Sequence, residues 1–360
     1  MQAPKYALLL AGVAAACVAD VGGPTTPEYD VIDLGALLPP CAEGTWCSSR
    51  AYDINDAGIV VGFHTTIGPW VLDGTTLIAL PLPPDSVSVK DDSGSAVSVN
   101  LAGQVVGHRG TAVWGPGVLW TNGVPQVLLL FPNDIDDAGR IVGAIRETHA
   151  DDTWTIAAIQ SADSIIRIGT LGGRRSEATG ISSAGLVVGW SYIATASDVH
   201  AFMVPSIGAG PVDLGVLPGA GPGDEQESTA NAVNSVGEIV GWSDGAWMDG
   251  PNEYGYAVLP VVWRGGTIVD LGTLGGRHGL AMDINELGWI VGGSVDPDGQ
   301  HRATLWREGE IVDLGSLPGY AASHAYRLNE AGDIVGYSFG PQDTRQHHRS
   351  TRATLWRRIW

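Results

Sequence analysis

The fold is decided by the stretch Asn55–Gly62, with the sequence NDAGIVVG, because its pattern recurs throughout the chain. Each copy begins with Asn, Asp or Ser, has glycine at its fourth and eighth positions, and carries Ile-Val or Val-Val before the second glycine. The copies begin at Asn55, Asn100, Asp136, Ser182, Asn234, Asn285 and Asn329. They lie 36 to 52 residues apart, which predicts one structural unit of that length in every repeat.

Every fixed position of the pattern has a physical reason. The side chains of Asn, Asp and Ser bond to the backbone two residues further on and open a tight turn. The first glycine supplies the positive φ that closes a short hairpin loop. The β-branched pair favours a strand, and the second glycine permits close approach of another backbone. The pattern therefore predicts a strand, a tight turn and a second strand.

Two more strands complete each repeat. In the sixth copy, Ala281–Ile284 is the strand before the turn. Arg302–Trp306 and Glu310–Leu314 are the third and fourth strands, joined by a turn at Glu308 and Gly309. Four short antiparallel strands in about 46 residues have the size of a β-propeller blade.

The two ends of the repeat region predict a closed ring. The last copy has its third strand, Ala353–Trp356, and lacks the fourth. The stretch Tyr29–Gly35 resembles the fourth strand of other copies, such as Ile268–Gly272. An N-terminal strand that completes the last blade leaves no open sheet edge, whereas a linear solenoid, the alternative, would leave two. We therefore predict an all-β fold, a seven-bladed propeller of four-stranded antiparallel blades.

Composition limits the classes of partner. The chain has 360 residues, 44% of them hydrophobic, which is enough for a packed core. Its 39 acidic and 19 basic residues give a net charge of −20, so phosphate backbones and anionic membrane surfaces would repel it. We expect a monomer without cofactor or metal that binds no nucleic acid and meets a membrane only through a lipid anchor.

The first residues have the features of an export signal. Lys5 precedes a short apolar run, Ala7–Ala16, and the small residues before Cys17 are typical of a bacterial lipobox. We predict a lipoprotein-type signal peptide over residues 1–17 with Cys17 lipidated, a flexible tether over 18–28 and the propeller over 29–360. Cleavage at an ordinary Ala-x-Ala site is the alternative. Either route predicts an extracytoplasmic protein, anchored or secreted.

Cysteine usage agrees with export. Cys41 and Cys47 lie six positions apart in one predicted loop, and the third cysteine is Cys17. A disulfide between Cys41 and Cys47 in an oxidising compartment leaves Cys17 for lipidation.

The chain resembles a bacterial family of probable extracellular repeat proteins, the HAF-repeat family. The eponymous motif stands at His200–Phe202. The family's second block, DLGxLGG, stands at Asp270–Gly276, with close variants starting at Asp213 and Asp313. The resemblance covers nearly all of residues 29–360. It implies an exported repeat protein, and the family brings no assigned catalytic residues.

Two motifs suggest chemistry, but repeat positions explain both better. Gly241–Gly245 matches the Gly-x-Ser-x-Gly nucleophile elbow, yet a serine follows the second glycine in several copies, which favours a structural serine. Asp53–Gly58 has the spacing of a calcium loop but lacks the further oxygen ligands that calcium needs, which favours turn chemistry. We predict no catalytic residue and no metal site.

The best binding candidates are equivalent positions around the ring. The residue after the second glycine is aromatic in five of the copies, and these candidate ligand-facing residues are Phe63, His108, Trp190, Trp242 and Tyr337. If they face the central channel, their rings offer stacking surfaces for sugars or other flat ligands. Packing between blades is the alternative. The longest departures from the repeat, Pro218–Thr229 and Asp244–Tyr256, are candidate partner loops.

These observations favour a binding or scaffolding module at the cell envelope, with a carbohydrate or a protein as its ligand. The alternative is a propeller-type hydrolase or lyase with its site at the mouth of the central channel. Converging carboxylates or histidines at one mouth favour the enzyme, and a mouth lined by aromatic residues favours binding. A third class, a purely structural envelope protein, would show neither feature. A propeller fold hosts all three classes and does not decide between them.

Overall fold

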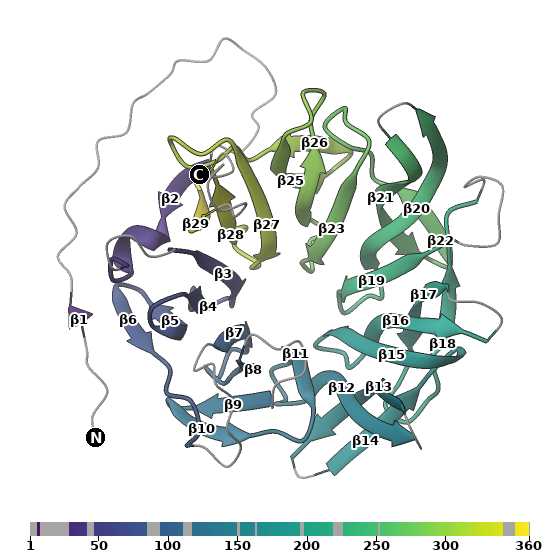
Figure 1. Cartoon of the computed structure of the whole chain (residues 1–360), viewed down its shortest axis with the longest axis horizontal. Coiled ribbons are helices and arrows are strands. Elements are labelled where there is room, and N and C mark those ends of the chain that lie inside the picture. Colours follow the sequence, from purple (N-terminus) through teal and green to yellow (C-terminus); the bar gives the residue numbers. More distant parts are fainter. Residues whose placement is uncertain are drawn as a thin grey trace.

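The protein is a ring of seven antiparallel blades around a central channel (Figure 1). The structure is a computed structural model that describes residues 6–7, 29–41, 47–84, 94–110, 117–149, 152–162, 164–194, 198–218, 226–250, 253–340 and 350–359. The seven-bladed propeller predicted from the repeat is therefore confirmed. Within the described residues, no helix has the length and apolar character needed to cross a membrane.

The strands follow the chain from the inside of each blade to the outside. Blades 1 and 2 contain β3 (Ser49–Ile54), β4 (Val60–His64), β5 (Gly68–Asp73), β6 (Thr76–Ala79), β7 (Gly94–Val99), β8 (Val105–Arg109), β9 (Gly117–Thr121) and β10 (Val124–Val127). Blades 3 and 4 contain β11 (Phe131–Ile135), β12 (Ile141–His149), β13 (Asp152–Ser161), β14 (Ser164–Gly169), β15 (Gly172–Ile181), β16 (Val187–Ile193), β17 (Val199–Val204) and β18 (Val212–Gly215). Blades 5 and 6 contain β19 (Ser228–Val233), β20 (Ile239–Gly250), β21 (Glu253–Arg264), β22 (Thr267–Asp270), β23 (Gly279–Ile284), β24 (Ile290–Val295), β25 (His301–Arg307) and β26 (Glu310–Asp313).

Blade 7 is built from both ends of the chain. It contains β27 (Ala322–Leu328), β28 (Ile334–Phe339), β29 (Thr351–Arg358) and, as its outer strand, β2 (Tyr29–Asp33). β2 pairs with β29 in the register Tyr29↔Arg358 to Asp33↔Thr354, which confirms the predicted ring closure. The short 3-10 helix η1 (Leu34–Leu37) follows β2. A two-residue strand, β1 (Tyr6–Ala7), also pairs with the outer strand β6 of blade 1.

The two glycines of the repeat behave as their positions predict. The first glycine has a φ between +72° and +86° in every copy. The second glycine lies so close to the inner strand that a Cβ would stand 1.8–2.1 Å from a carbonyl oxygen of that strand. No side chain fits at that distance, so the second glycine is needed for the blade to form.

Each inner strand carries an irregularity just before its end. In β3 the register shifts between Ala51 and Asp53, and equivalent shifts occur in the inner strands of the other six blades. A bulge re-aims the side chain that follows it. The residue after each shift therefore forms one tier near the end of the channel. The tier consists of Asp53, Ser98, Asp134, Gly180, Ala232, Asp283 and Arg327.

Tryptophans join neighbouring blades. Trp120, Trp263, Trp306 and Trp356 are at most 3% exposed and belong to the apolar clusters of the blades. Trp306 in blade 6 also donates its indole N–H to the carbonyl oxygen of Gly272 after blade 5, at 3.0 Å. Trp263 bonds in the same way to Leu214 at 3.1 Å. These side chains serve packing, as their recurrence indicates.

Candidate functional site

The repeat turns form a hydrogen-bonded ring on one face of the propeller, called here the turn face. Asn55 Oδ1 accepts from the backbone N–H groups of Ala57 and Ile59, at 3.1 and 2.9 Å. Asn55 Nδ2 donates to the carbonyl oxygen of Asn100 in the next blade, at 2.9 Å. Asn329 Nδ2 donates in the same way to Asn55, at 3.3 Å, so that the last blade is tied to the first. The turn asparagines therefore do structural work, both within a blade and between blades.

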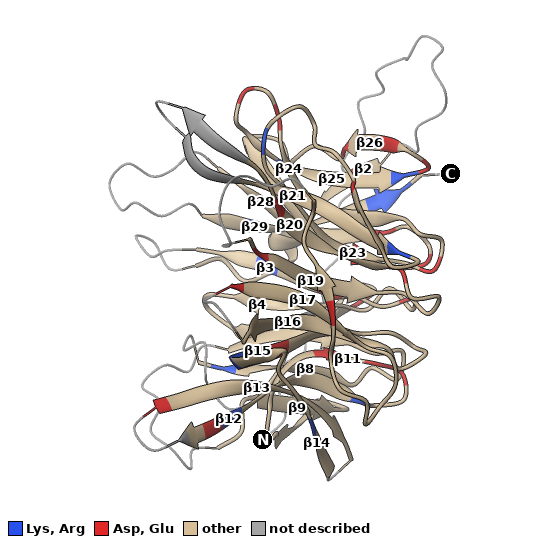
Figure 2. Ribbon diagram, turned by 90° about the vertical axis from the view of Figure 1, so that its right-hand side faces the viewer, with Lys and Arg blue, Asp and Glu red and all other residues tan. Residues whose placement is uncertain are grey.

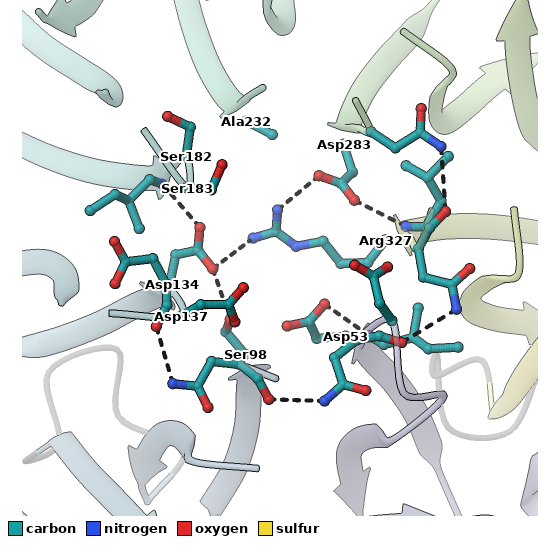
Figure 3. A pocket seen from close by; sticks show the side chains of 18 of the residues that line it. Asp53, Ser98, Asp134, Asp137, Ser182, Ser183, Ala232, Asp283 and Arg327 are labelled. Atoms are coloured by element: carbon teal, nitrogen blue, oxygen red, sulfur yellow. Dashed lines mark hydrogen bonds and ion pairs between the residues drawn. The ribbon is translucent and has the colours of Figure 1, made fainter. Parts of the chain in front are cut away.

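Three aspartates of the channel tier, called here the channel aspartates, also join blades (Figure 3). Their acceptor oxygens bind backbone N–H groups of the following blade. The pairs are Asp53 with Val99 at 2.8 Å, Asp134 with Ile181 at 3.0 Å and Asp283 with Leu328 at 3.0 Å. These links between blades were not predicted from the sequence, although all three repeats carry an Asp two positions before the turn residue.

Arg327 extends from blade 7 into the middle of the channel aspartates (Figure 3). Its guanidinium lies 3.0 Å from Asp283 Oδ1 and 3.7 Å from Asp134 Oδ1, in blades 6 and 3. Burial raises the pKa of Asp53 to about 6, although the nearby Arg327 opposes this shift. Burial likewise raises the pKa of Asp283. Burial acts to lower the pKa of Arg327, but Asp134, Asp283 and Asp53 together raise it, so the guanidinium stays charged.

This cluster lies at the floor of a hollow of about 200 Å³ at the turn face. Three carboxylates converge there, which is the arrangement that the enzyme alternative requires. Each channel aspartate, however, has an oxygen bound to the backbone of the neighbouring blade. The geometry therefore explains the cluster first as a structural one, which joins blades to one another around and across the channel.

The five predicted ligand-facing residues lie on the second strands of their blades. All of them, Phe63, His108, Trp190, Trp242 and Tyr337, are half-buried. The guanidinium of Arg50 in blade 1 lies 4.7 Å above the ring of Tyr337 in blade 7, so Tyr337 packs between two blades. Burial lowers the pKa of His108 to about 4. None of the five lines the hollow at the turn face.

The serine of the elbow-like motif is structural, as its repeat position favours. Ser243 is fully buried, and its hydroxyl accepts the backbone N–H of Leu217 at 3.0 Å. Ser191, Ser294 and Ser338 accept from Leu171, Leu274 and Leu317 in the same manner, at 2.8, 2.9 and 3.0 Å. Each serine thereby fixes the link that leads into its own blade from the blade before it.

The two motifs that carry the HAF resemblance meet in space. His200 Nδ1 lies 2.9 Å from a carboxylate oxygen of Asp213, the first residue of a DLG block. This hydrogen bond raises the pKa of His200. Arg302 and Arg352 hold the equivalent register and face Asp313 and Asp33. The motifs therefore form a basic–acidic pair across two strands of one blade.

Blades 3 and 4 form a hollow that the sequence analysis missed. Strands β12 and β13 have 9 and 10 residues, against 5 in β8, so their hairpin reaches beyond the neighbouring blade on the face opposite the turns, called here the hairpin face (Figure 2). A hollow of about 210 Å³, the arginine hollow, is lined by Arg146, Thr153, Trp154, Thr155 and Arg175.

The arginine hollow concentrates positive charge in an acidic protein. Arg174, next to the lining residue Arg175, places its guanidinium 5.1 Å from the ring centre of Trp154. Within the described residues, neither Arg174 nor Arg175 forms an ion pair. Seven other arginines of the described residues do so, in the pairs Arg140–Asp136, Arg167–Glu147, Arg264–Glu238, Arg302–Asp296, Arg307–Glu310, Arg327–Asp283 and Arg352–Asp33. Thr155 is 4% exposed, and its hydroxyl has no hydrogen-bond partner among the described residues.

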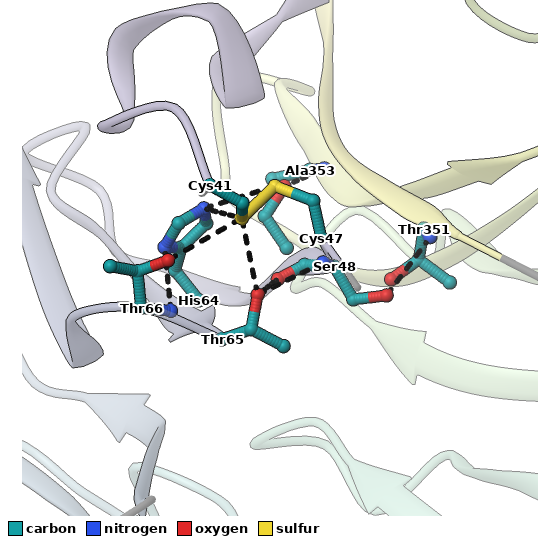
Figure 4. Close-up of a disulfide and its surroundings, with 9 residues drawn as sticks. Cys41, Cys47, Ser48, His64, Thr65, Thr66, Thr351 and Ala353 are labelled. Atoms are coloured by element: carbon teal, nitrogen blue, oxygen red, sulfur yellow. Dashed lines mark hydrogen bonds between the residues drawn. A yellow bond between two sulfur atoms is a disulfide. The ribbon is translucent and has the colours of Figure 1, made fainter. Parts of the chain in front are cut away.

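Cys41 and Cys47 form a disulfide, with their Cα atoms 5.6 Å apart (Figure 4). It lies beside His64 at the end of β4, on the hairpin face. The predicted lipidation site, Cys17, lies outside the described residues.

Comparisons with known proteins show the fold. No family model and no curated protein sequence matches the chain, so the HAF resemblance stays a prediction. Among solved structures, a puromycin hydrolase superposes with a TM-score of 0.51 at 14% identity, over 91% of this chain and 57% of that one. TolB of Acinetobacter baumannii has a TM-score of 0.36 at 12% identity, over 67% of this chain and 59% of its own. A gluconolactonase of Xanthomonas campestris has a TM-score of 0.36 at 10% identity, over 96% and 100%. This chain therefore spans less than two thirds of the first two.

Proposed function

We propose that this protein is a binding module and that the arginine hollow holds a carboxylate-bearing glycan. One observation carries the proposal. In a chain with a net charge of −20, Arg174 and Arg175 have no ion pair among the described residues and stand beside a hollow with a buried hydroxyl. Such charges attract an anionic ligand from solution.

The chemistry of the hollow suits a uronic acid. A guanidinium stacked on an indole keeps its in-plane N–H groups available. Two of these N–H groups can donate parallel hydrogen bonds to the two oxygens of a carboxylate. Thr153 and Thr155 also line the hollow. The neighbouring carboxylate of Glu147 is neutralised by Arg167 at 2.7 Å, so it does not repel such a ligand.

We expect oligogalacturonate to bind in the arginine hollow and a neutral galactose oligomer of equal length not to bind. Replacing Arg174 or Arg175 by Gln is expected to weaken binding about tenfold or more, because each change removes a charge-assisted hydrogen bond. Isothermal titration calorimetry at two salt concentrations measures the loss and its electrostatic share.

The matched control is Arg264→Gln, which removes an exposed arginine paired with Glu238 in blade 5. It should leave binding unchanged. Equal affinity for the neutral oligomer, or wild-type affinity in both hollow variants, would refute the proposal.

The predicted export signal completes the proposal. We infer that the chain leaves the cytoplasm and is held at the envelope by a lipid on Cys17, with residues 18–28 as the tether. The apolar run before Cys17 and the disulfide between Cys41 and Cys47 support this inference. Mass spectrometry of the mature protein should find the lipid on Cys17, and an unmodified Cys17 would contradict the anchor.

A hydrolase site at the turn face is the second candidate. It is favoured by the convergence of the channel aspartates and by the pKa of Asp53, which lies at about 6 and suits a group that gives and takes protons near neutral pH. The likeness to a puromycin hydrolase concerns the fold alone. If this candidate is right, hydrolysis of amide, ester or lactone substrates should fall at least about a hundredfold in Asp53→Asn. Absence of turnover in the folded wild type would exclude these substrates.

A further inference from the structure

The disulfide on the hairpin face has surroundings that distinguish its two sulfur atoms. Thr66 Oγ1 donates a hydrogen bond to Cys41 Sγ at 3.4 Å, and Thr65 Oγ1 lies 3.5 Å from the same atom (Figure 4). His64 Nε2 lies 3.7 Å from Cys41 Sγ and 3.8 Å from Cys47 Sγ. The sulfur of Cys41 is therefore the one with the richer set of donors.

The ring of His64 is fixed as a neutral donor. Its Nδ1 accepts the backbone N–H of Thr66 at 3.2 Å, so Nε2 carries the proton that points to the sulfur atoms. Burial, helped by the charge of Arg352, lowers the pKa of His64. The same arrangement disfavours a metal at this place, because a histidine that ligates through Nε2 normally donates from Nδ1.

The two cysteines also differ in their position relative to a neighbouring hollow. A hollow of about 370 Å³ lies against Cys47, and its lining includes Cys47 and His64 but not Cys41. Arg352 and Tyr320 also line it, and Arg352 is paired with Asp33 at 2.8 Å. A thiolate that enters the hollow meets Cys47 next to a cationic side chain.

We propose that Cys41 and Cys47 form a redox-active pair that exchanges with a dithiol reductant through this hollow. A thiolate of the reductant attacks Cys47 Sγ, the disulfide bond breaks, and its electron pair leaves on Cys41 Sγ. The products are a mixed disulfide on Cys47 and a Cys41 thiolate stabilised by the donors of His64 and Thr66. The second thiol of the reductant, as a thiolate, then attacks the reductant's sulfur atom in the mixed disulfide. This forms the reductant's own disulfide and releases Cys47 as a thiolate. Two electrons and two protons pass in all, and the reductant ends as a disulfide.

The donors make Cys41 the better leaving group, because thiol–disulfide exchange is faster when the departing thiol has a low pKa. They also stabilise the reduced form, so the pair becomes easier to reduce than a disulfide surrounded by apolar groups. A disulfide with a purely structural role needs neither the donors nor the access.

The test uses the folded chain over residues 18–360, incubated with glutathione buffers of defined ratio and then alkylated. We expect reduction without denaturant, and trapped glutathione on Cys47 rather than on Cys41 in peptide maps. In Cys47→Ser, the rate of iodoacetamide alkylation against pH should give Cys41 a pKa below the value of about 8.5 of a free thiol.

Thr66→Val keeps the shape of the side chain and removes one donor. We expect it to lower the equilibrium constant for reduction by about tenfold, the value of one hydrogen bond to a charged group. Thr267→Val, at the exposed start of β22, is the matched control and should change nothing. A free-thiol pKa for Cys41, reduction only after unfolding, or equal effects of the two threonine variants would each overturn the proposal.

Discussion

Replacing Arg327 by Met is expected to lower the free energy of unfolding at pH 7 by about 3–5 kcal/mol. The guanidinium faces Asp283 at 3.0 Å and Asp134 at 3.7 Å inside the channel. Methionine has an unbranched stem and no charge, so the variant leaves the channel aspartates buried without a cation. Urea unfolding followed by tryptophan fluorescence measures the loss.

The pH dependence of this loss separates electrostatics from packing. The pKa of Asp53 is raised from 3.8 to about 6 in the folded protein, so the folded state binds protons more readily than the unfolded state between these values. The cost of the ionised carboxyl is therefore absent below about pH 4 and complete above about pH 6. Without Arg327 the channel aspartates are easier still to protonate. The difference in the free energy of unfolding between Arg327→Met and the wild type should therefore shrink as the pH falls from 7 to 5.

Arg264→Met is the control for Arg327→Met. Arg264 is 47% exposed and pairs with Glu238 at 2.7 Å on the surface of blade 5. Such exposed pairs contribute about 0–1 kcal/mol. Equal losses in the two variants, or a loss in Arg327→Met that does not change with pH, would mean that the channel aspartates are not held by Arg327.

The repeat predicts the propeller because its constraints are local. The turn residue, the positive φ of Gly58 and the close approach at Gly62 all act within one hairpin and recur in every blade. Closure by Tyr29–Asp33 is predictable for the same reason, since a missing strand at one end of the chain has its counterpart at the other.

The contact of Arg327 with the channel aspartates could not be predicted from such local constraints. Asp53 points into the channel because a bulge after Ala51 re-aims it, and no residue in the sequence of β3 marks that bulge. The tier position is Arg in one repeat only, at Arg327, and its partner Asp134 lies in blade 3, across the ring. Only the closed ring brings the two together.

A ligand-facing role for the five aromatic positions remains a prediction, and the ring adds one constraint on it. Equivalent residues such as Trp190 and Tyr337 are paired with residues of the inner strand, Glu177 and His324, and share a sheet face with them. Faces of propeller blades point to neighbouring blades, so equivalence around the ring does not mean convergence on the channel. The arginine hollow was not predicted because the polar stretch 146–153 has the composition of a loop, whereas in the structure β12 continues to His149 and β13 begins at Asp152.

Deleting β2, residues 29–33, is expected to lower the melting temperature by about 10 °C or more. Tyr29 and Val31 pack against an apolar cluster between blades 6 and 7, which contains Trp356. The deletion also removes the ladder to β29 and the bond from Arg352 to Asp33. Differential scanning calorimetry of chains starting at residue 29 and at residue 34 measures the difference between a ring with and without its closing strand.

The two chains should also differ in association and in local protection. Without β2, the unpaired edge of β29 becomes a template for another strand, so the shorter chain should self-associate in size-exclusion chromatography. Its β29 amides should exchange with deuterium faster than those of β17, the equivalent strand of an intact blade. If the shorter chain stays monomeric and melts at the same temperature, the ring is held shut without β2. The hydrogen bond from Asn329 to Asn55 on the turn face, which also joins blades 7 and 1, would then contribute more to closing the ring than β2 does.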